Sequence, residues 1–185
     1  MKRIGKLFCL ALSLVMSIVV FNPGVGAASG HEHDIAAHKS CQYCGMDREK
    51  FAHSRMLIEF EDGTSVATCS LHCAAVDLAN NIDKTPKSIK VADYATKQLT
   101  DAEKAYWVVG GSKQGVMTRN AKWAFAAKDK AEAFIKENGG KLASFDEAIK
   151  AAYEDMYTDT KMIRDKRKQM KMKKEGPSKG NDMKH

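Results

Sequence analysis

Four cysteines in two close pairs constrain this chain more than any other feature. Cys41 and Cys44 form a CxxC motif, and Cys69 and Cys73 form a CxxxC motif further along. Two such pairs can form disulfides in an oxidising compartment, or they can hold one zinc ion with four thiolates. A treble-clef-like binding module, stabilised by zinc or by disulfides, is therefore one prediction from the cysteines.

The stretch CQYCGM, residues 41–46, also fits a softer metal. Met46 follows Cys44 by two residues, and the glycine between them lets both side chains turn toward one point. A thiolate and a thioether together favour Cu(I) over zinc. A methionine can instead fill a gap in a core, but its place directly after the CxxC motif favours a ligand. A thioredoxin-like redox motif is less favoured, because CQYC follows a polar segment instead of a strand.

The N-terminal residues predict export. Basic residues precede an apolar run over 7–21, which has the length of a signal-peptide core and is short for a membrane span. Small residues before Ala27 fit cleavage there, and cleavage after Ala28 fits nearly as well. Cys9 leaves with the signal and lies in the wrong context for lipidation. We expect residues 1–27 to be a signal peptide and the mature chain to be periplasmic and not a lipoprotein.

The net charge of +7 comes largely from the C-terminal end. Ten of the 30 Lys and Arg residues lie beyond residue 160, and residues 28–160 are close to neutral. The chain has no basic face with interleaved aromatic residues, so the sequence does not predict a nucleic-acid interface. The basic tail over 159–185 could make weak electrostatic contact with a membrane or an acidic partner.

Hydrophobic periodicity predicts an α+β fold that begins with a β-β-α-β unit. Apolar residues alternate around Asp62-Gly63, which is a strong hairpin signal. Ser70 is a favourable N-cap for the helix that follows. The first unit, within residues 41–95, is expected to contain strands near 55–60, 65–68 and 88–94 and a helix over 70–81.

A second unit of the same order is predicted within residues 104–158. Gly139-Gly140 closes its first helix, since glycine is common just past a helix end. Ser144 and Glu147 form a capping box for a last helix. The expected elements are strands over 105–111 and 121–127, a helix over 128–140, a short strand over 141–144 and a helix over 145–157.

Two terminal segments flank the predicted domain over 41–158. Residues 28–40 are small, polar and His-rich, which predicts a flexible arm. Residues 159–185 predict a basic, Met-rich tail that could extend the last helix for some turns, up to Gly176-Pro177, and is otherwise disordered. The arm offers imidazole and carboxylate groups to Cu(II) or zinc through His31, Glu32, His33, Asp34 and His38. The tail carries groups that could collect Cu(I), although disorder is the favoured interpretation: Met162, Met170, Met172, Met183 and His185.

These features together resemble the NosL family, the copper-binding accessory proteins of nitrous-oxide reductase. The resemblance covers roughly residues 41–152. It rests on C-G-M at 44–46, the D-G hairpin, YWVVGGSKQGVMT with Met117, and AEAFIKENGGKLASFDEA. The resemblance implies an exported protein with two β-β-α-β units. It also implies binding of Cu(I) through a Cys-x-Met pair and further soft ligands, and transfer of copper to an assembly machinery.

The resemblance also implies site residues. Cys44 and Met46 correspond to copper ligands, and Met117 falls where the family has a methionine after a turn of small residues, with core packing as its alternative. His72 could add an imidazole, but a histidine on the helix surface is the favoured interpretation. The CxxxC pair at 69–73 is not part of the family pattern, which leaves open a general heavy-metal-binding protein without a dedicated recipient.

The sequence therefore predicts a periplasmic Cu(I) metallochaperone and not an enzyme. Its expected partner is a copper-accepting periplasmic enzyme, such as nitrous-oxide reductase, or the membrane complex that assembles it. Neither a Ser-His-Asp set, nor a pair of carboxylates, nor a phosphate loop is evident in the sequence. The alternative is the zinc- or disulfide-stabilised module that uses Cys41, Cys44, Cys69 and Cys73.

Overall fold

The computed structural model of the protein describes residues 30–175. The predicted signal peptide over 1–27 and the end of the tail, with Met183 and His185, lie outside these residues, as do the side chains of His31 and Glu32. In chain order, the elements are α1 (Gly30–Ala37), β1 (Met56–Phe60), β2 (Ser65–Thr68), α2 (Leu71–Asn80), β3 (Pro86–Ala92), β4 (Leu99–Asp101), β5 (Tyr106–Val109), β6 (Lys122–Phe125), α3 (Lys128–Asn138), β7 (Lys141–Ala143) and α4 (Phe145–Glu175).

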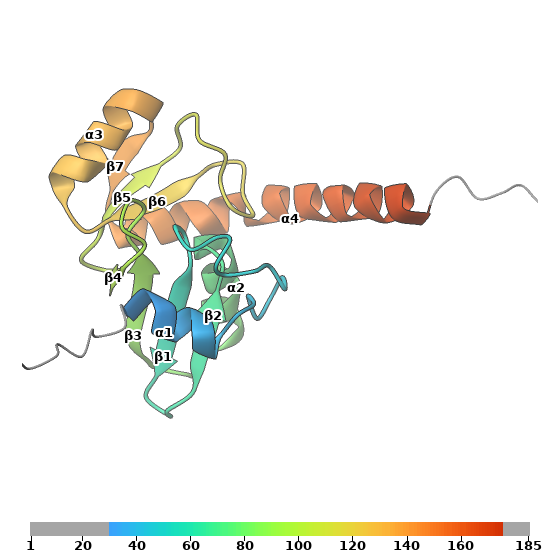
Figure 1. The fold of residues 1–185 in the computed structure, drawn as a ribbon, viewed down its shortest axis with the longest axis horizontal. Helices are drawn as coiled ribbons and strands as arrows, with labels where there is room; N and C mark the ends of the chain where they lie inside the picture. The colour runs from blue at the N-terminus through green and yellow to red at the C-terminus, as the bar shows by residue number, and fades with distance from the viewer. Residues whose placement is uncertain (1–29, 176–185) are drawn as a thin grey trace, which may run out of the picture.

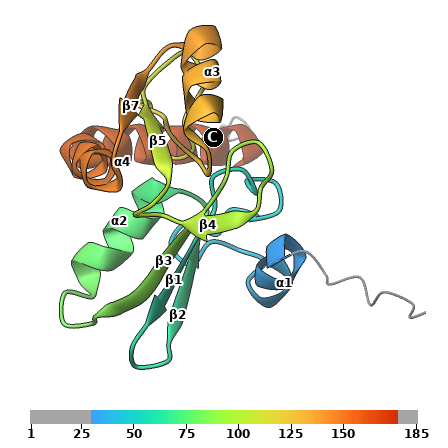
Figure 2. The same cartoon turned by 90° about the vertical axis from the view of Figure 1, so that its left-hand side faces the viewer.

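The two predicted β-β-α-β units are confirmed. The first forms an antiparallel sheet in the order β2-β1-β3-β4, and the second forms one in the order β6-β5-β7. Strand β4 is an addition that the sequence analysis did not predict. Figure 1 shows the two sheets one above the other, and Figure 2 shows α4 lying between the two units, with α2 below it and α3 above it.

Local sequence signals explain where the elements begin and turn. Strand β1 buries every second side chain, and the Asp62-Gly63 hairpin joins it to β2, with Gly63 at φ 82°. The capping box of α4 is present: Glu147 accepts from the Ser144 amide at 2.7 Å, and the Ser144 hydroxyl accepts from the Glu147 amide at 3.2 Å. Ser70 precedes α2 with extended backbone, but its side chain makes no capping hydrogen bond.

One hydrophobic core joins the two units. Ile58 of β1, Trp107 of β5 and Ala148 of α4 are all buried in it. The bridge between Asp93 and Ala124 adds a backbone link, in which the Tyr94 amide donates to the Ala124 carbonyl at 2.8 Å. The Asp93 side chain adds a second link, because it accepts a hydrogen bond from the Ala126 amide at 2.8 Å. The units therefore hold each other in place, and residues from both can contribute to one site.

The arm differs from the flexible segment that the sequence predicts. Residues 30–37 form α1, and the Asp34 carboxylate is buried between two buried arginines. Its oxygens lie 2.8 Å from Arg48 Nη2 and 2.7 Å from Arg55 Nη2. Burial alone would raise the pKa of Asp34, but the two guanidinium groups outweigh it and lower the pKa. Two buried cations that need an anion thus explain why this polar segment is ordered.

Much of the predicted tail extends the last helix. Helix α4 continues to Glu175, 31 residues in all, and its second half projects beyond both sheets in Figure 1. Within residues 30–175, no helix has both the length and the hydrophobicity that a membrane span requires.

Candidate metal centre

The CQYCGM stretch folds into a tight loop that is closed at both ends. Its flanks are joined by a bridge between Ser40 and Asp47. The Cys41 amide donates to the Met46 carbonyl at 2.8 Å, and the Gly45 amide donates to the Cys41 carbonyl at 2.9 Å. Gly45 has φ 74°, which a residue with a side chain rarely adopts. The glycine of C-G-M therefore lets the chain reverse so that the thiols and the thioether stay on one side.

Tyr43, inside the CxxC motif, attaches this loop to helix α2. Its hydroxyl donates to Asp77 Oδ1 at 2.5 Å, and Asp77 is buried. Burial and the neighbouring carboxylate raise the pKa of Tyr43 to about 12, so the phenol keeps its proton. The loop and α2, which carries the second cysteine pair, are thereby fixed relative to each other.

The second cysteine pair lies at the junction between β2 and α2. Cys69 lies between the two elements, and Cys73 lies in the first turn of the helix. The Ser54 hydroxyl donates to the Cys69 carbonyl at 2.8 Å, and the Gln42 amide donates to the Ala67 carbonyl at 3.0 Å. The Gln42 bond ties the end of β2 to the CQYCGM loop, and the Ser54 bond holds Cys69 against the segment that follows this loop.

All four thiols meet in one cluster, whose sulfur atoms lie within 4.8 Å of one another. Cys44 Sγ lies 3.5 Å from Cys69 Sγ, and Cys69 Sγ lies 3.8 Å from Cys73 Sγ. All four are free, and Cys44 alone among them is half-buried, whereas the other three are buried. Four sulfurs at this spacing are suitably placed to surround a single thiophilic cation.

The four thiols shift one another's pKa in opposite directions. Hydrogen bonds from Cys44, Cys69 and Cys73 lower the pKa of Cys41. Hydrogen bonds with Cys41 and Cys44 raise the pKa of Cys69 and of Cys73, and nearby negative charge acts in the same direction. A metal ion among the sulfurs would compensate this charge and displace the remaining protons, so binding would release protons.

A pocket of about 440 Å³ opens beside the cluster. Cys44, Met46 and Met117 lie on its wall, and all three are partly buried and pack against a hydrophobic cluster that contains Cys41, Cys69 and Cys73. The other side comes from α4, which contributes Met162, Ile163, Lys166, Arg167 and Met170. The structure therefore brings together the three residues that the NosL resemblance implies as ligands, at the accessible side of the thiol cluster.

Met117 has an unusual backbone conformation. It lies in the loop between β5 and β6 with φ 62°, a region that non-glycine residues seldom occupy. The loop is held against α4, since Asn120 Nδ2 donates to Asp155 at 2.8 Å and the Arg119 amide donates to Asp159 at 3.1 Å. A strained residue that is fixed by its surroundings and faces a pocket is typical of a functional position.

His72 is not the surface residue that the sequence analysis favoured. The ring is buried beneath α4, with Nδ1 3.7 Å from Asp159 Oδ2, and neither of these atoms has a hydrogen-bond partner among the described residues. Burial lowers the pKa of His72, although the Asp159 carboxylate acts in the opposite direction. The earlier interpretation is wrong because α4 is longer than predicted and covers this face of α2. His72 also lies outside the cluster of four thiols.

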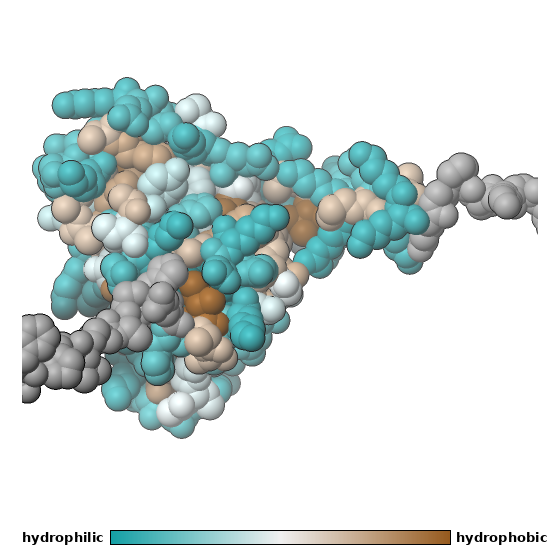
Figure 3. Space-filling model, viewed as in Figure 1, coloured by the Kyte–Doolittle hydropathy of each residue, from teal (hydrophilic) through white to brown (hydrophobic). Residues whose placement is uncertain are grey.

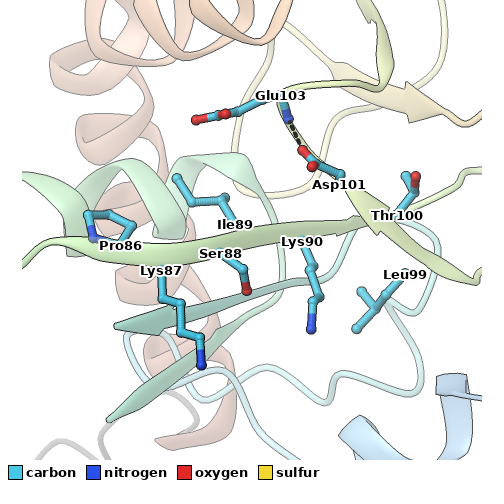
Figure 4. Close-up of a pocket in the computed structure, with 9 residues that line it drawn as sticks. All are labelled: Pro86, Lys87, Ser88, Ile89, Lys90, Leu99, Thr100, Asp101 and Glu103. Atoms are coloured by element: carbon cyan, nitrogen blue, oxygen red, sulfur yellow. Dashed lines mark hydrogen bonds between the residues drawn. The ribbon is translucent and has the colours of Figure 1, made fainter. Parts of the chain in front are cut away.

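A second hollow lies over β3 and β4 and is drawn in Figure 4. Its walls are Pro86, Lys87, Ser88, Ile89, Lys90, Leu99, Thr100, Asp101 and Glu103. None of these residues offers sulfur or imidazole, which soft metals prefer. The hollow is therefore separate from the candidate metal centre.

Comparison with known proteins identifies the family. A family model described as NosL matches residues 32–153. The chain belongs to the NosL family. The match covers both β-β-α-β units and the four cysteines of the thiol cluster, and the last part of α4 lies beyond it.

Two known proteins show how this NosL chain compares with its relatives. A solved structure, the copper chaperone NosL from Shewanella denitrificans, has 26% identity and a TM-score of 0.50, over 60% of this chain and 90% of that chain. The HTH-type transcriptional repressor CutR of Bacillus subtilis is 31% identical over 121 residues. These residues are 65% of this chain and 60% of CutR, so the chain spans about three-fifths of that curated relative.

Proposed function

We propose that the protein is a periplasmic Cu(I)-binding metallochaperone that supplies copper for assembly of nitrous-oxide reductase or a similar copper enzyme. Membership of a copper chaperone family supports a carrier, and it shows that the chain is not an enzyme. In this proposal residues 1–27 are a cleaved signal peptide and residues 41–158 are the metal-binding domain. The copper ion is cargo that the protein binds and then releases.

The observation that carries the proposal is the meeting of Cys44, Met46 and Met117 at one accessible pocket. Cu(I) is a soft ion that favours thiolate and thioether sulfur, and zinc rarely accepts a thioether. Cys44 belongs to both the thiol cluster and the pocket wall, so it can receive an ion from the pocket. We expect Cys44 and Met46 to capture Cu(I) and Met117 to complete a site with few ligands.

The openness of this site suits transfer. A metal enclosed by Cys41, Cys69 and Cys73, which are buried, would be difficult for a partner to reach. A metal held at the half-buried Cys44 leaves room for an incoming ligand from the acceptor, so the ion can pass from one protein to the other by ligand exchange. The recipient in this proposal is a copper-accepting periplasmic enzyme or the membrane complex that assembles it.

A second candidate function follows from the presence of four thiols in one cluster. Four sulfurs within 4.8 Å of one another could hold zinc as a closed structural site, in which Met46 and Met117 would only pack. The chain would then be a zinc-stabilised binding module. The two proposals differ in the metal and in whether the thioethers contact it.

Substitution of Cys44 separates the two functions. In Cys44→Ser we expect the Cu(I) affinity of the reduced protein to fall by at least about tenfold, because the accessible thiolate is lost. An anaerobic titration against a competing Cu(I) chelator measures this. An unchanged Cu(I) affinity together with lost zinc binding would favour the zinc module.

A further inference from the structure

The part of α4 that extends past the NosL match lines the pocket of the candidate metal centre. The match ends at residue 153, and α4 continues to Glu175. Five residues of this extension line the pocket beside Cys44: Met162, Ile163, Lys166, Arg167 and Met170. In Figure 3 hydrophobic residues gather where α4 leaves the globular part, and the outer helix is mainly hydrophilic.

Specific contacts hold the extension at the pocket. Arg167 Nη2 donates to the Cys44 carbonyl at 3.2 Å, which joins the helix to the CQYCGM loop. Arg119 Nε donates to Met162 Sδ at 3.4 Å, which places this sulfur next to the loop that carries Met117. Ile163 is half-buried. The wall formed by α4 is therefore positioned by the same loops that present the predicted copper ligands.

The pocket lining distinguishes the methionines of this helix. Met162 and Met170 both line the pocket and are eight residues apart, about 80° around the helix axis and about 12 Å along it. Met172 is two residues further, about 200° around the axis from Met170, and is not among the residues that line the pocket. Met156, fewer than two turns before Met162, packs against the hydrophobic core that joins the two units.

We propose that Met162 and Met170 are Cu(I) ligands that α4 adds to the pocket, opposite Cys44, Met46 and Met117. The proposal rests on the proposed copper-carrier function. The spacing along the helix means that the two thioethers bind the ion in succession. Met162 acts beside Met117 at the inner end, and Met170 acts at the outer end, where it is 56% exposed.

The chemistry of thioethers suits such a passage. A thioether is neutral and binds Cu(I) without losing a proton, so the ion can move between methionines with no proton transfer. Lys166 and Arg167 on the same wall place positive charge near the cation, which disfavours its binding there. Weak binding along α4 and tighter binding at Cys44 would then lead the ion inward.

Methyl resonances of the methionines test this proposal directly. The reduced mature protein, labelled with ¹³C at the methionine methyl groups, is titrated with Cu(I) under anaerobic conditions. We expect the signals of Met46, Met117, Met162 and Met170 to shift, and those of Met156 and Met172 to stay in place. Each signal is assigned by its loss in the corresponding Met→Leu variant, a change that conserves volume.

Competition with a Cu(I) chelator gives a second readout. Met162→Leu/Met170→Leu is expected to lower by about tenfold the affinity for Cu(I) added beyond the first equivalent, and Met172→Leu, the matched control on the same helix, to leave this affinity unchanged. If the Met46 signal shifts but those of Met162 and Met170 do not, or if the double variant binds the added Cu(I) as tightly as the wild type, this inference is wrong and the copper-carrier function stands. If no methionine signal responds to Cu(I), both are wrong.

Discussion

Replacing Asp34 by alanine is expected to destabilise the protein by about 3–5 kcal/mol, because it leaves buried cations without their anion. Arg48 and Arg55 have no solvent-exposed side-chain area, and both bind this one carboxylate. Arg48 also donates to the carbonyls of Thr68 and Met56, next to the thiol cluster. Urea unfolding of the metal-free reduced protein measures the loss. We expect α1 to detach and the CQYCGM loop to loosen with it.

A surface ion pair provides the control for this variant. Lys128 and Glu132 form an exposed pair on α3 with 3.5 Å between charged atoms. Glu132→Ala should change the free energy of unfolding by no more than about 0.5 kcal/mol. Equal effects of Asp34→Ala and Glu132→Ala would mean that the buried ion pairs of Asp34 contribute little to stability and do not hold α1 in place.

The ion pairs of Asp34 with Arg48 and Arg55 also predict that the free energy of unfolding depends on pH. The folded protein lowers the pKa of Asp34, so the unfolded chain binds the proton more readily. This contribution to stability is complete above the ordinary carboxyl pKa, and it is lost as the pH falls through that value toward the lowered pKa of the folded state. Below the ordinary carboxyl pKa of 3.8, the wild-type protein should therefore lose stability more steeply than Asp34→Ala. Parallel curves would contradict this role.

Met46→Leu is the second substitution with a large expected effect. We expect the Cu(I) affinity to fall roughly 10- to 100-fold, because leucine matches the volume of methionine but has no sulfur to bind the metal. Zinc affinity and the free energy of unfolding should stay close to those of the wild type. An anaerobic competition titration for each metal, together with urea unfolding, measures all three quantities.

The control for Met46→Leu is Met156→Leu. Both methionines are partly buried, but Met156 packs against the core that joins the two units, and Met46 packs against a second hydrophobic cluster that contains Cys41, Cys69 and Cys73. Met156→Leu should leave the affinity for both metals unchanged. If Met46→Leu instead unfolds the protein, or if it keeps the full Cu(I) affinity, Met46 is a packing residue and not a ligand.

Local signals made most of the fold predictable. The Asp62-Gly63 hairpin and the Ser144–Glu147 capping box are interactions between residues close in sequence, and the structure contains both. The order of two β-β-α-β units follows from the same alternation and capping signals. Strand β4 was missed because its three residues are too short to show a period.

Contacts between distant segments could not be predicted in the same way. The composition of the arm predicts disorder. That Asp34 is buried becomes evident only from the structure, where Arg48 and Arg55 both pair with its carboxylate. His72 was assigned to a surface because the length of α4, which covers it, is not visible in the sequence around residue 72. These interpretations failed for one reason: the partner lies in a distant part of the chain.

The candidate site depends both on local signals and on contacts between distant segments. The CxxC and CxxxC spacings indicate that each pair can act together, but the meeting of all four thiols depends on how the loop docks against α2. The spacing of Met162 and Met170 by eight residues was present in the sequence. This spacing did not indicate a site, because the sequence does not show that α4 lies beside the pocket. Disorder was therefore the favoured prediction for the tail.

X-ray absorption of the metal bound to the reduced mature protein tests the central claim most directly. The protein is loaded anaerobically with Cu(I) and zinc in competition, and the spectra of wild type and Met46→Leu are compared at the edge of the bound metal. We predict that copper is retained, with few sulfur ligands, and that one sulfur is lost in Met46→Leu. Retention of zinc by four sulfurs, with no change in the variant, would contradict the copper-carrier function.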